Sequence, residues 1–392
     1  MKKIQLLGFL MLITSSLLFI QCTHDPYQAV DGIDGVDGAN GADGADGADG
    51  IEGTASCVNC HSNSHRDSIT AAYNISLHSI QTMMYTGQTL AEYTNRTYCA
   101  QCHTSQGFIE FQETGAIQDA AVIPTQISCT TCHSDHDTFD FITDGPDYAL
   151  RNIEALHLIV DETYTIDYGN TSNSCIQCHQ PRTATPTDDG NGAFTVTSSH
   201  WGPHHGPQST MLEGIQGALI SGSVSYPGIA SSTHRTSSSC VNCHMEATTN
   251  GLDGSHSMWP TDNACITCHT GGVPSEVSGL ASDMDMLAVS LENVIGWEYE
   301  FEVDGNGDLV LDANGDPIIV LDGNGDPVTL EVHGIIHDGH PNNGSFGEGA
   351  TFTILEAQAA WNYLFVMEDK SEGVHNPAYA KALIQNSIEA LD

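Results

Sequence analysis

Twelve of the thirteen cysteines in this chain fall into six C-x-x-C pairs, and a histidine follows every pair. The six motifs are CVNCH (57–61), CAQCH (99–103), CTTCH (129–133), CIQCH (175–179), CVNCH (240–244) and CITCH (265–269). Disulfides place no demand on the residue after each pair, and zinc ribbons do not need a histidine there. Because only 20 of the 392 residues are histidine, the repeated pattern indicates attachment sites for c-type haem.

Each motif supplies two kinds of contact to haem. Its cysteines form thioether bonds to the vinyl groups, and its histidine binds the iron from one side. The predicted thioether residues are Cys57, Cys60, Cys99, Cys102, Cys129, Cys132, Cys175, Cys178, Cys240, Cys243, Cys265 and Cys268. The predicted proximal ligands are His61, His103, His133, His179, His244 and His269. The sequence therefore predicts six covalently bound haem c groups, each with one iron.

The length of chain available per haem limits the fold. Residues 57–392 supply 56 residues per motif, which is little chain for a conventional core around six macrocycles. We expect the haems to provide much of the buried apolar surface. The predicted fold is mostly irregular and α-helical, with a hexahaem region over residues 54–275.

The first 22 residues read as an export signal. Lys2 and Lys3 precede an apolar run that is too short for a membrane span. Cys22 closes this run, an arrangement that resembles a bacterial lipobox, although Gln21 before it is not small. We expect lipidation of Cys22, with ordinary signal cleavage as the alternative. The expected location is the outer membrane or cell surface, or the extracellular space, with the periplasm as the alternative.

Residues 23–53 form the next predicted segment. Glycine recurs at every third position from Gly32 to Gly53 without proline, between mostly small and acidic residues. We expect an extended acidic spacer, with a short trimeric collagen-like stalk as the alternative. The net charge of −41 argues against binding to nucleic acid or to an anionic membrane surface.

The C-terminal region, residues 276–392, contains no C-x-x-C-H motif. Helices are predicted over the start of 280–301 and over 353–373 and 376–391, the last opened by Pro377. Three D-x-N-G-D turns separated by apolar residues predict a small β-ribbon over about 298–332. Their spacing also resembles the start of a Ca²⁺ loop, but the later glycine and glutamate are missing.

Fourteen histidines lie outside the motifs, and a low-spin haem needs a second axial ligand. His136 follows His133 too closely to reach the opposite face of the same haem, so we expect it to bind a neighbouring iron; a solvated loop histidine is the alternative. The other candidates by context are His78, His200, His204, His205, His234, His256 and His375. Weaker candidates are His24, His65, His157, His333, His337 and His340.

Several segments resemble those of multihaem c-type cytochromes, both extracellular ones and members of the nitrite-reductase superfamily. They are CAQCHTSQGF, CIQCHQPR, HWGPHHGPQSTML, CVNCHM, GSHSMWP and GVHNPAYAKAL, and they cover most of residues 57–275 and the last two helices. The resemblance implies distal ligation by His78, His204, His205, His234, His256 and His375. No attachment site here ends in lysine, so the resemblance does not extend to a lysine-ligated catalytic haem.

Two functions fit these observations. The first is an electron carrier with mostly bis-histidine haems, which passes electrons to other redox proteins, cytochromes or extracellular acceptors. The short spacer and compact haem region also permit self-assembly into a filament. The second is a reductase of small nitrogen or sulfur oxyanions, which needs one open iron and nearby proton donors. Arg182 and Arg235 lie near haem motifs, where pairing with haem propionates is the simpler expectation. The carrier is the preferred interpretation.

Overall fold

The computed structural model describes most of the chain beyond the predicted spacer. The described residues are 55–79, 97–117, 125–196, 201–291 and 351–392, with the single positions 302, 310, 318, 320 and 321. All of them belong to one compact unit, Thr54–Asp392. The predicted export signal, Cys22, the spacer and most of the predicted β-ribbon lie outside the described residues.

Each of the six motifs coincides with a short helix. These are α2 (Ala55–His61), α6 (Thr97–His103), α8 (Cys129–Cys132), α9 (Asn173–Ile176), α12 (Cys240–His244) and α13 (Asp262–Ile266). A C-x-x-C spacing places both cysteines on one face of a helical turn. Backbone hydrogen bonds such as His179 N to Cys175 O, 3.1 Å, hold the motif histidine one turn beyond the first cysteine.

The segments between the motifs add short helices and one small sheet. The helices are α3 (Asn63–Asn74), α7 (Ser105–Thr114), α10 (Gln208–Glu213), α11 (Thr233–Ser237) and the 3₁₀ turn η2 (Ser255–Ser257). Strands β1 (Leu156–Leu158) and β2 (Asp161–Ile166) pair antiparallel. The expectation that helices predominate in this region is therefore confirmed, and the β1–β2 hairpin was not predicted.

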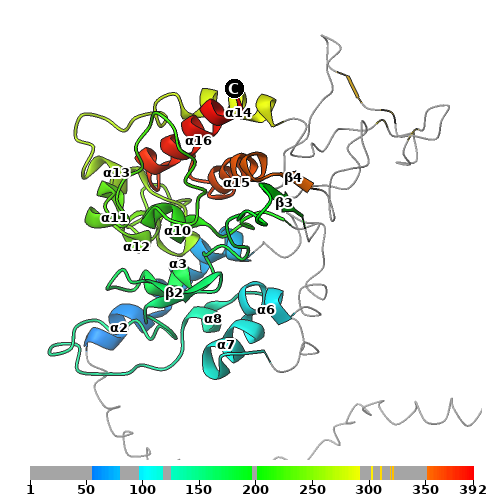
Figure 1. Cartoon of the computed structure of the whole chain (residues 1–392). Coiled ribbons are helices and arrows are strands. Elements are labelled where there is room, and N and C mark those ends of the chain that lie inside the picture. The colour runs from blue at the N-terminus through cyan, green and yellow to red at the C-terminus, as the bar shows by residue number, and fades with distance from the viewer. Residues whose placement is uncertain are drawn as a thin grey trace, which may run out of the picture. The chain divides into compact units, whose positions relative to one another are not determined.

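The C-terminal region contains three longer helices, α14 (Leu280–Ser290), α15 (Ile354–Glu368) and α16 (Pro377–Leu391). α15 begins with a capping box between Thr353 and Glu356. α16 begins with Pro377 in its first turn, and the Asn376 side chain caps it by accepting from Tyr379 N. All three predicted helices are confirmed, and Figure 1 shows them lying side by side.

A two-stranded sheet connects the C-terminal region to the motif region. Strand β3 (Ala193–Thr195) pairs antiparallel with β4 (Thr351–Thr353), with Phe194 opposite Phe352. β4 leads directly into α15. The sheet therefore fixes the start of α15 against the segment that follows the fourth motif.

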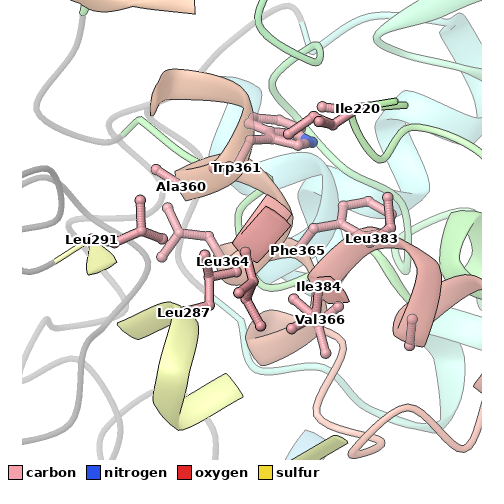
Figure 2. Packing of buried hydrophobic residues seen from close by; sticks show 14 of the residues in the cluster. Ile220, Leu287, Leu291, Ala360, Trp361, Leu364, Phe365, Val366, Leu383 and Ile384 are labelled. Carbon is pink, nitrogen blue, oxygen red and sulfur yellow. The ribbon is translucent and has the colours of Figure 1, made fainter. Parts of the chain in front are cut away.

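The main apolar core lies among α14, α15 and α16. Trp361, Leu364 and Phe365 of α15 are fully buried there, together with Leu287 of α14 and Leu383 of α16. Figure 2 shows side chains from the three helices meeting in this cluster. α15 is apolar around most of its circumference, and nine of its fifteen residues are buried.

A polar contact fixes the loop at 216–220 against the same helices. Asn362, fully buried, accepts a hydrogen bond from Ala218 N and donates to Ala218 O. The Gly217 N–H donates to the Tyr379 hydroxyl at 2.9 Å. A Cβ at Gly217 would lie 2.5 Å from Leu383, so glycine permits this close approach of the loop to α16.

A smaller apolar cluster lies beneath the β1–β2 hairpin. It contains Leu158 and Ile166 from the strands, Ile176 from α9, and Leu212 and Ile215 from the α10 segment. This cluster positions the fourth motif against α10. In the part of the chain that the structure describes, no helix is long and apolar enough to cross a membrane.

Little of the predicted β-ribbon can be described. Glu302, Val310 and Ile318 are joined by three backbone hydrogen bonds of 2.8–2.9 Å. The three acidic turns between and beyond these positions lie outside the described residues. Among the described residues, no group of three or more His, Cys, Asp or Glu side chains is arranged to hold a metal ion.

Candidate functional site

Every motif histidine faces one histidine from outside the motifs, and the separation of the ring centres is nearly constant. The distances are 6.0 Å for His61–His136, 6.0 Å for His78–His179, 5.9 Å for His103–His204, 6.2 Å for His133–His256, 6.1 Å for His234–His269 and 6.3 Å for His244–His375. We call these the six histidine pairs.

This spacing fits a metal ion between the two rings. A metal–imidazole bond is about 2 Å long, so two imidazoles that bind one metal from opposite sides have ring centres about 6 Å apart. The neighbouring rings of His204 and His205, in contrast, are 4.7 Å apart. The motif cysteines are half-buried or exposed as residues, and none of them is part of a disulfide. The residues present therefore fit haem c.

The second histidine of the CTTCHSDHD segment lies opposite a motif histidine other than its own. His136 faces His61 of the first motif, whereas His133 of its own motif faces His256. Asp147 holds the loop in place, because its carboxylate accepts backbone hydrogen bonds from Asp137, Thr138 and Ala149. One short segment thus contributes to two different pairs.

The structure separates the predicted distal histidines into two groups. Of the eight principal candidates, six belong to pairs: His78, His136, His204, His234, His256 and His375. His205 does not face a motif histidine; its Nδ1 lies 2.7 Å from Glu368 Oε2. Among the weaker candidates, the ring of His157 contacts Thr165 across the hairpin. His24, His200, His333, His337 and His340 lie outside the described residues.

Burial keeps several paired rings neutral. It lowers the pKa of His78 to about 4, with a smaller contribution from His179. Burial also lowers the pKa of His103 to about 4, helped by the charges of His205 and Arg182. The pKa values of His179, His244 and His256 are lowered mainly for the same reason. Neutral imidazole is the form that binds metals.

Hydrogen bonds to Nδ1 orient several of the paired rings, which leaves Nε2 directed at the partner ring. The acceptor is a backbone carbonyl for His133 (Tyr148 O, 2.8 Å), His234 (Val374 O, 2.5 Å) and His244 (Met258 O, 2.8 Å). His179 contacts the side-chain oxygen of Gln208 at 3.0 Å.

His375 has a carboxylate acceptor instead. Its Nδ1 lies 2.7 Å from Asp369 Oδ1, and the Asp369 side chain is fully buried. Burial alone would lower the pKa of His375, but the charge of Asp369 and the hydrogen bond to it raise the pKa above its ordinary value.

The backbone is left-handed at several non-glycine residues beside the pairs. His204 has φ 67°, and Ser255, which precedes His256, has φ 49°. Met258, whose carbonyl binds His244, has φ 59°. Such conformations are uncommon outside glycine and are found often at functional sites. Here they turn ring or carbonyl groups toward the pairs.

The motifs lie close to one another. The thiols of Cys102 and Cys178 lie beside each other, as do those of Cys175 and Cys240. These contacts bring the second and the fifth motif against the fourth. Cys132 also lies near Cys175, and Cys243 lies near Cys265, so the third motif is beside the fourth and the sixth beside the fifth.

The two arginines near the motifs have partners in the structure. Arg235 Nε donates to Glu213 at 2.5 Å, and its guanidinium lies 4.3 Å from the ring centre of Tyr168. Arg182 lies 5.0 Å from the ring centre of Tyr98. Sequence reasoning identified both arginines but missed Asp369, Glu368 and Gln208. The only signal for the two carboxylates is an acidic pair directly after an apolar helix.

The family model and the curated relative that match this chain both describe cytochromes. Residues 44–190 match the family model for the outer membrane cytochrome MtrC/MtrF-like domains II/IV. The C-type polyheme cytochrome OmcC of Geobacter sulfurreducens is 24% identical over 318 residues, which are 74% of this chain and 36% of that protein. The matches support a multihaem c-type cytochrome. This agrees with the class predicted from the six motifs.

Two solved structures are also similar. The outer cell wall cytochrome OcwA matches with a TM-score of 0.43 and 16% identity, over 82% of this chain and 50% of that one. The undecaheme cytochrome from the S-layer of Carboxydothermus ferrireducens matches with a TM-score of 0.38 and 16% identity, over 81% and 40%. The chain spans about a third of the curated relative's length and half or less of the two solved chains.

Proposed function

We propose that this chain is an exported electron-transfer protein that holds six c-type haems, each bound between the two rings of one histidine pair. The main support is the nearly constant distance of 5.9–6.3 Å between the two ring centres in each of the six pairs. In this proposal the twelve motif cysteines form the thioether bonds. The ligands opposite the motif histidines are His78, His136, His204, His234, His256 and His375.

Haem supplies one-electron Fe(III)/Fe(II) chemistry when it is bound. The protein holds neutral imidazoles at a fixed orientation. The ligand geometry therefore changes little when the iron is reduced or oxidised. Buried rings such as His78 and hydrogen bonds to Nδ1, as in His179 with Gln208, serve this role.

The adjacency of the motifs supports conduction through the whole set. The fourth motif contacts the second and fifth, with the third beside it and the sixth beside the fifth. The segment from His133 to His136 connects the first pair to the third. These neighbours connect all six pairs into one branched set, which suits electron transfer between haems.

We also propose that the protein is located outside the cytoplasm. Covalent haem attachment, the predicted export signal and the predicted lipidation of Cys22 all suit a protein attached to the outer surface of a membrane. The similar proteins carry outer membrane, outer cell wall and S-layer in their descriptions. We propose other cytochromes or extracellular acceptors as redox partners; self-assembly into a filament stays a prediction.

The reductase alternative is less well supported. It requires an iron with an open or exchangeable position. Each of the six motif histidines, all of which the structure describes, has a second histidine opposite it. Arg235, one of the two arginines considered for substrate binding, already contacts Glu213.

The proposal is tested by the haem count and the spin state. Intact mass of the purified protein should correspond to six haems per chain, and EPR spectra of the oxidised protein should contain low-spin bis-histidine signals only. In a His136→Ala variant, one haem per chain should become high-spin, because His61 loses the ring opposite it. His157→Ala is the matched control, since His157 lies in no pair and contacts Thr165, and its spectrum should equal that of the wild type.

A wild-type protein with fewer than six haems would contradict the proposal. So would a stoichiometric high-spin signal that shifts when nitrite, hydroxylamine or cyanide is added, which would instead favour the reductase.

A further inference from the structure

Two neighbouring buried carboxylates lie where α15 ends. Glu368 and Asp369 have side chains that are 1% and 0% exposed, although a buried charge is unfavourable unless it is hydrogen-bonded or paired. Each carboxylate contacts a different histidine, Glu368 the ring of His205 and Asp369 the ring of His375. His375 belongs to a histidine pair and His205 does not.

The contact between Asp369 and His375 is fixed from several directions. Ser371 donates its hydroxyl to the other Asp369 oxygen, and the same hydroxyl accepts from His375 N at 3.2 Å. Asp369 N donates to Phe365 O at the end of α15. The carboxylate is therefore held by the end of α15 and by the turn that leads to α16.

The partner ring has a weaker acceptor. His244 donates from Nδ1 to the backbone carbonyl of Met258, whereas the acceptor for His375 carries a full negative charge. Hydrogen bonds to an ionised group are roughly twice as strong as neutral ones. A carboxylate on Nδ1 also makes the ligand more basic, and such a ligand favours the oxidised, more positive iron.

We propose that Asp369 is a positioning residue that fixes the His375 ring and lowers the reduction potential of the haem between His244 and His375. This inference rests on the proposed function, because it requires a haem in that pair. It assigns a redox role to the C-terminal region, which contains no attachment motif.

The test is a spectroelectrochemical titration of the full-length holoprotein and its Asp369→Asn variant. We expect one of the six midpoint potentials to rise by about 59 mV, a tenfold change in a one-electron equilibrium. The EPR signal of one low-spin haem should shift with it. Glu368→Gln is the matched control: it removes a neighbouring buried charge but leaves the acceptor of His375 in place, so that same potential should move by less than half as much.

A double-mutant cycle shows whether Asp369 acts through His375. His375→Met should raise one midpoint potential, because a thioether replaces an imidazole. The potential that rises belongs to the haem between His244 and His375. In that background Asp369→Asn should have no further effect on the potential. The inference is overturned by an undiminished shift in the double variant, by an equal shift in Glu368→Gln, or by no shift in Asp369→Asn.

The haem count and the EPR spectrum of the wild type are measured before the midpoint potentials, because they test the proposed function separately. Fewer than six haems, or a high-spin haem, would contradict the proposed function. Six low-spin haems with an unchanged potential in Asp369→Asn would contradict only the role of Asp369. Intact mass of each variant confirms that all six haems are attached.

Discussion

Two helices of similar length show how differently the two regions are stabilised. α15 in the C-terminal region has nine buried residues among fifteen. α3 in the motif region has twelve residues, and none of them is buried; the motif helices α12 and α13 also contain no buried residue. The C-terminal helices are held by apolar contacts within the polypeptide, whereas α3, α12 and α13 of the motif region bury none of their own residues.

The largest expected effect is the loss of haem. In a variant with all twelve motif cysteines changed to serine, amide hydrogen exchange in α3, α12 and α13 should come within about tenfold of the unfolded rate, because these helices lack buried contacts of their own. Amides of α15 and α16 should stay protected. Mass spectrometry of exchanged peptides measures both regions in one sample. Equal protection of the two regions would show that the comparison is wrong.

A change inside the C-terminal core should have a smaller but still large effect. Trp361→Ala should destabilise the protein by about 3–5 kcal/mol, since Trp361 is fully buried and donates to Gln216 O. Chemical denaturation followed by far-ultraviolet circular dichroism measures the loss. Val289→Ala on α14, where the side chain is 73% exposed, should stay within about 0.5 kcal/mol of the wild type. Equal losses in the two variants would remove the evidence for a separate core.

The smallest effect concerns one hydrogen bond between the regions. Tyr379→Phe should cost about 1–3 kcal/mol, because the buried N–H of Gly217 loses its acceptor. Burial raises the pKa of Tyr379 well above its ordinary value. The wild type should therefore lose stability as the pH rises above the unfolded-state pKa of about 10, where only the unfolded chain readily ionises.

The phenylalanine variant should lack that part of the alkaline decline. Denaturation curves between neutral and alkaline pH measure it. Tyr148→Phe is the control, because Tyr148 is 57% exposed, and it should change the free energy of unfolding by less than about 0.5 kcal/mol at neutral pH. An identical alkaline decline in Tyr379→Phe and the wild type would contradict the role given to this hydroxyl.

Local signals predicted the C-terminal helices well. The Thr353–Glu356 capping box and Pro377 are short-range features, and both mark helix starts in the structure. The β1–β2 hairpin was missed because its turn at residues 159–160, Ile-Val, contains none of the usual hairpin residues. The predicted β-ribbon, spacer and lipid anchor lie largely or wholly outside the described residues and stay predictions.

The sequence by itself determined the haem chemistry of this protein, because thioether cysteines and the proximal histidine must be adjacent in the chain to attach one haem. It also narrowed the opposite ligands to a few histidines. Only the tertiary structure decided which histidine faces which motif, as His375 faces His244 and His205 faces none. Such pairing depends on contacts between residues far apart in the chain, which no local spacing encodes. The same holds for Asp369, whose importance comes from burial beside His375 and not from its sequence context.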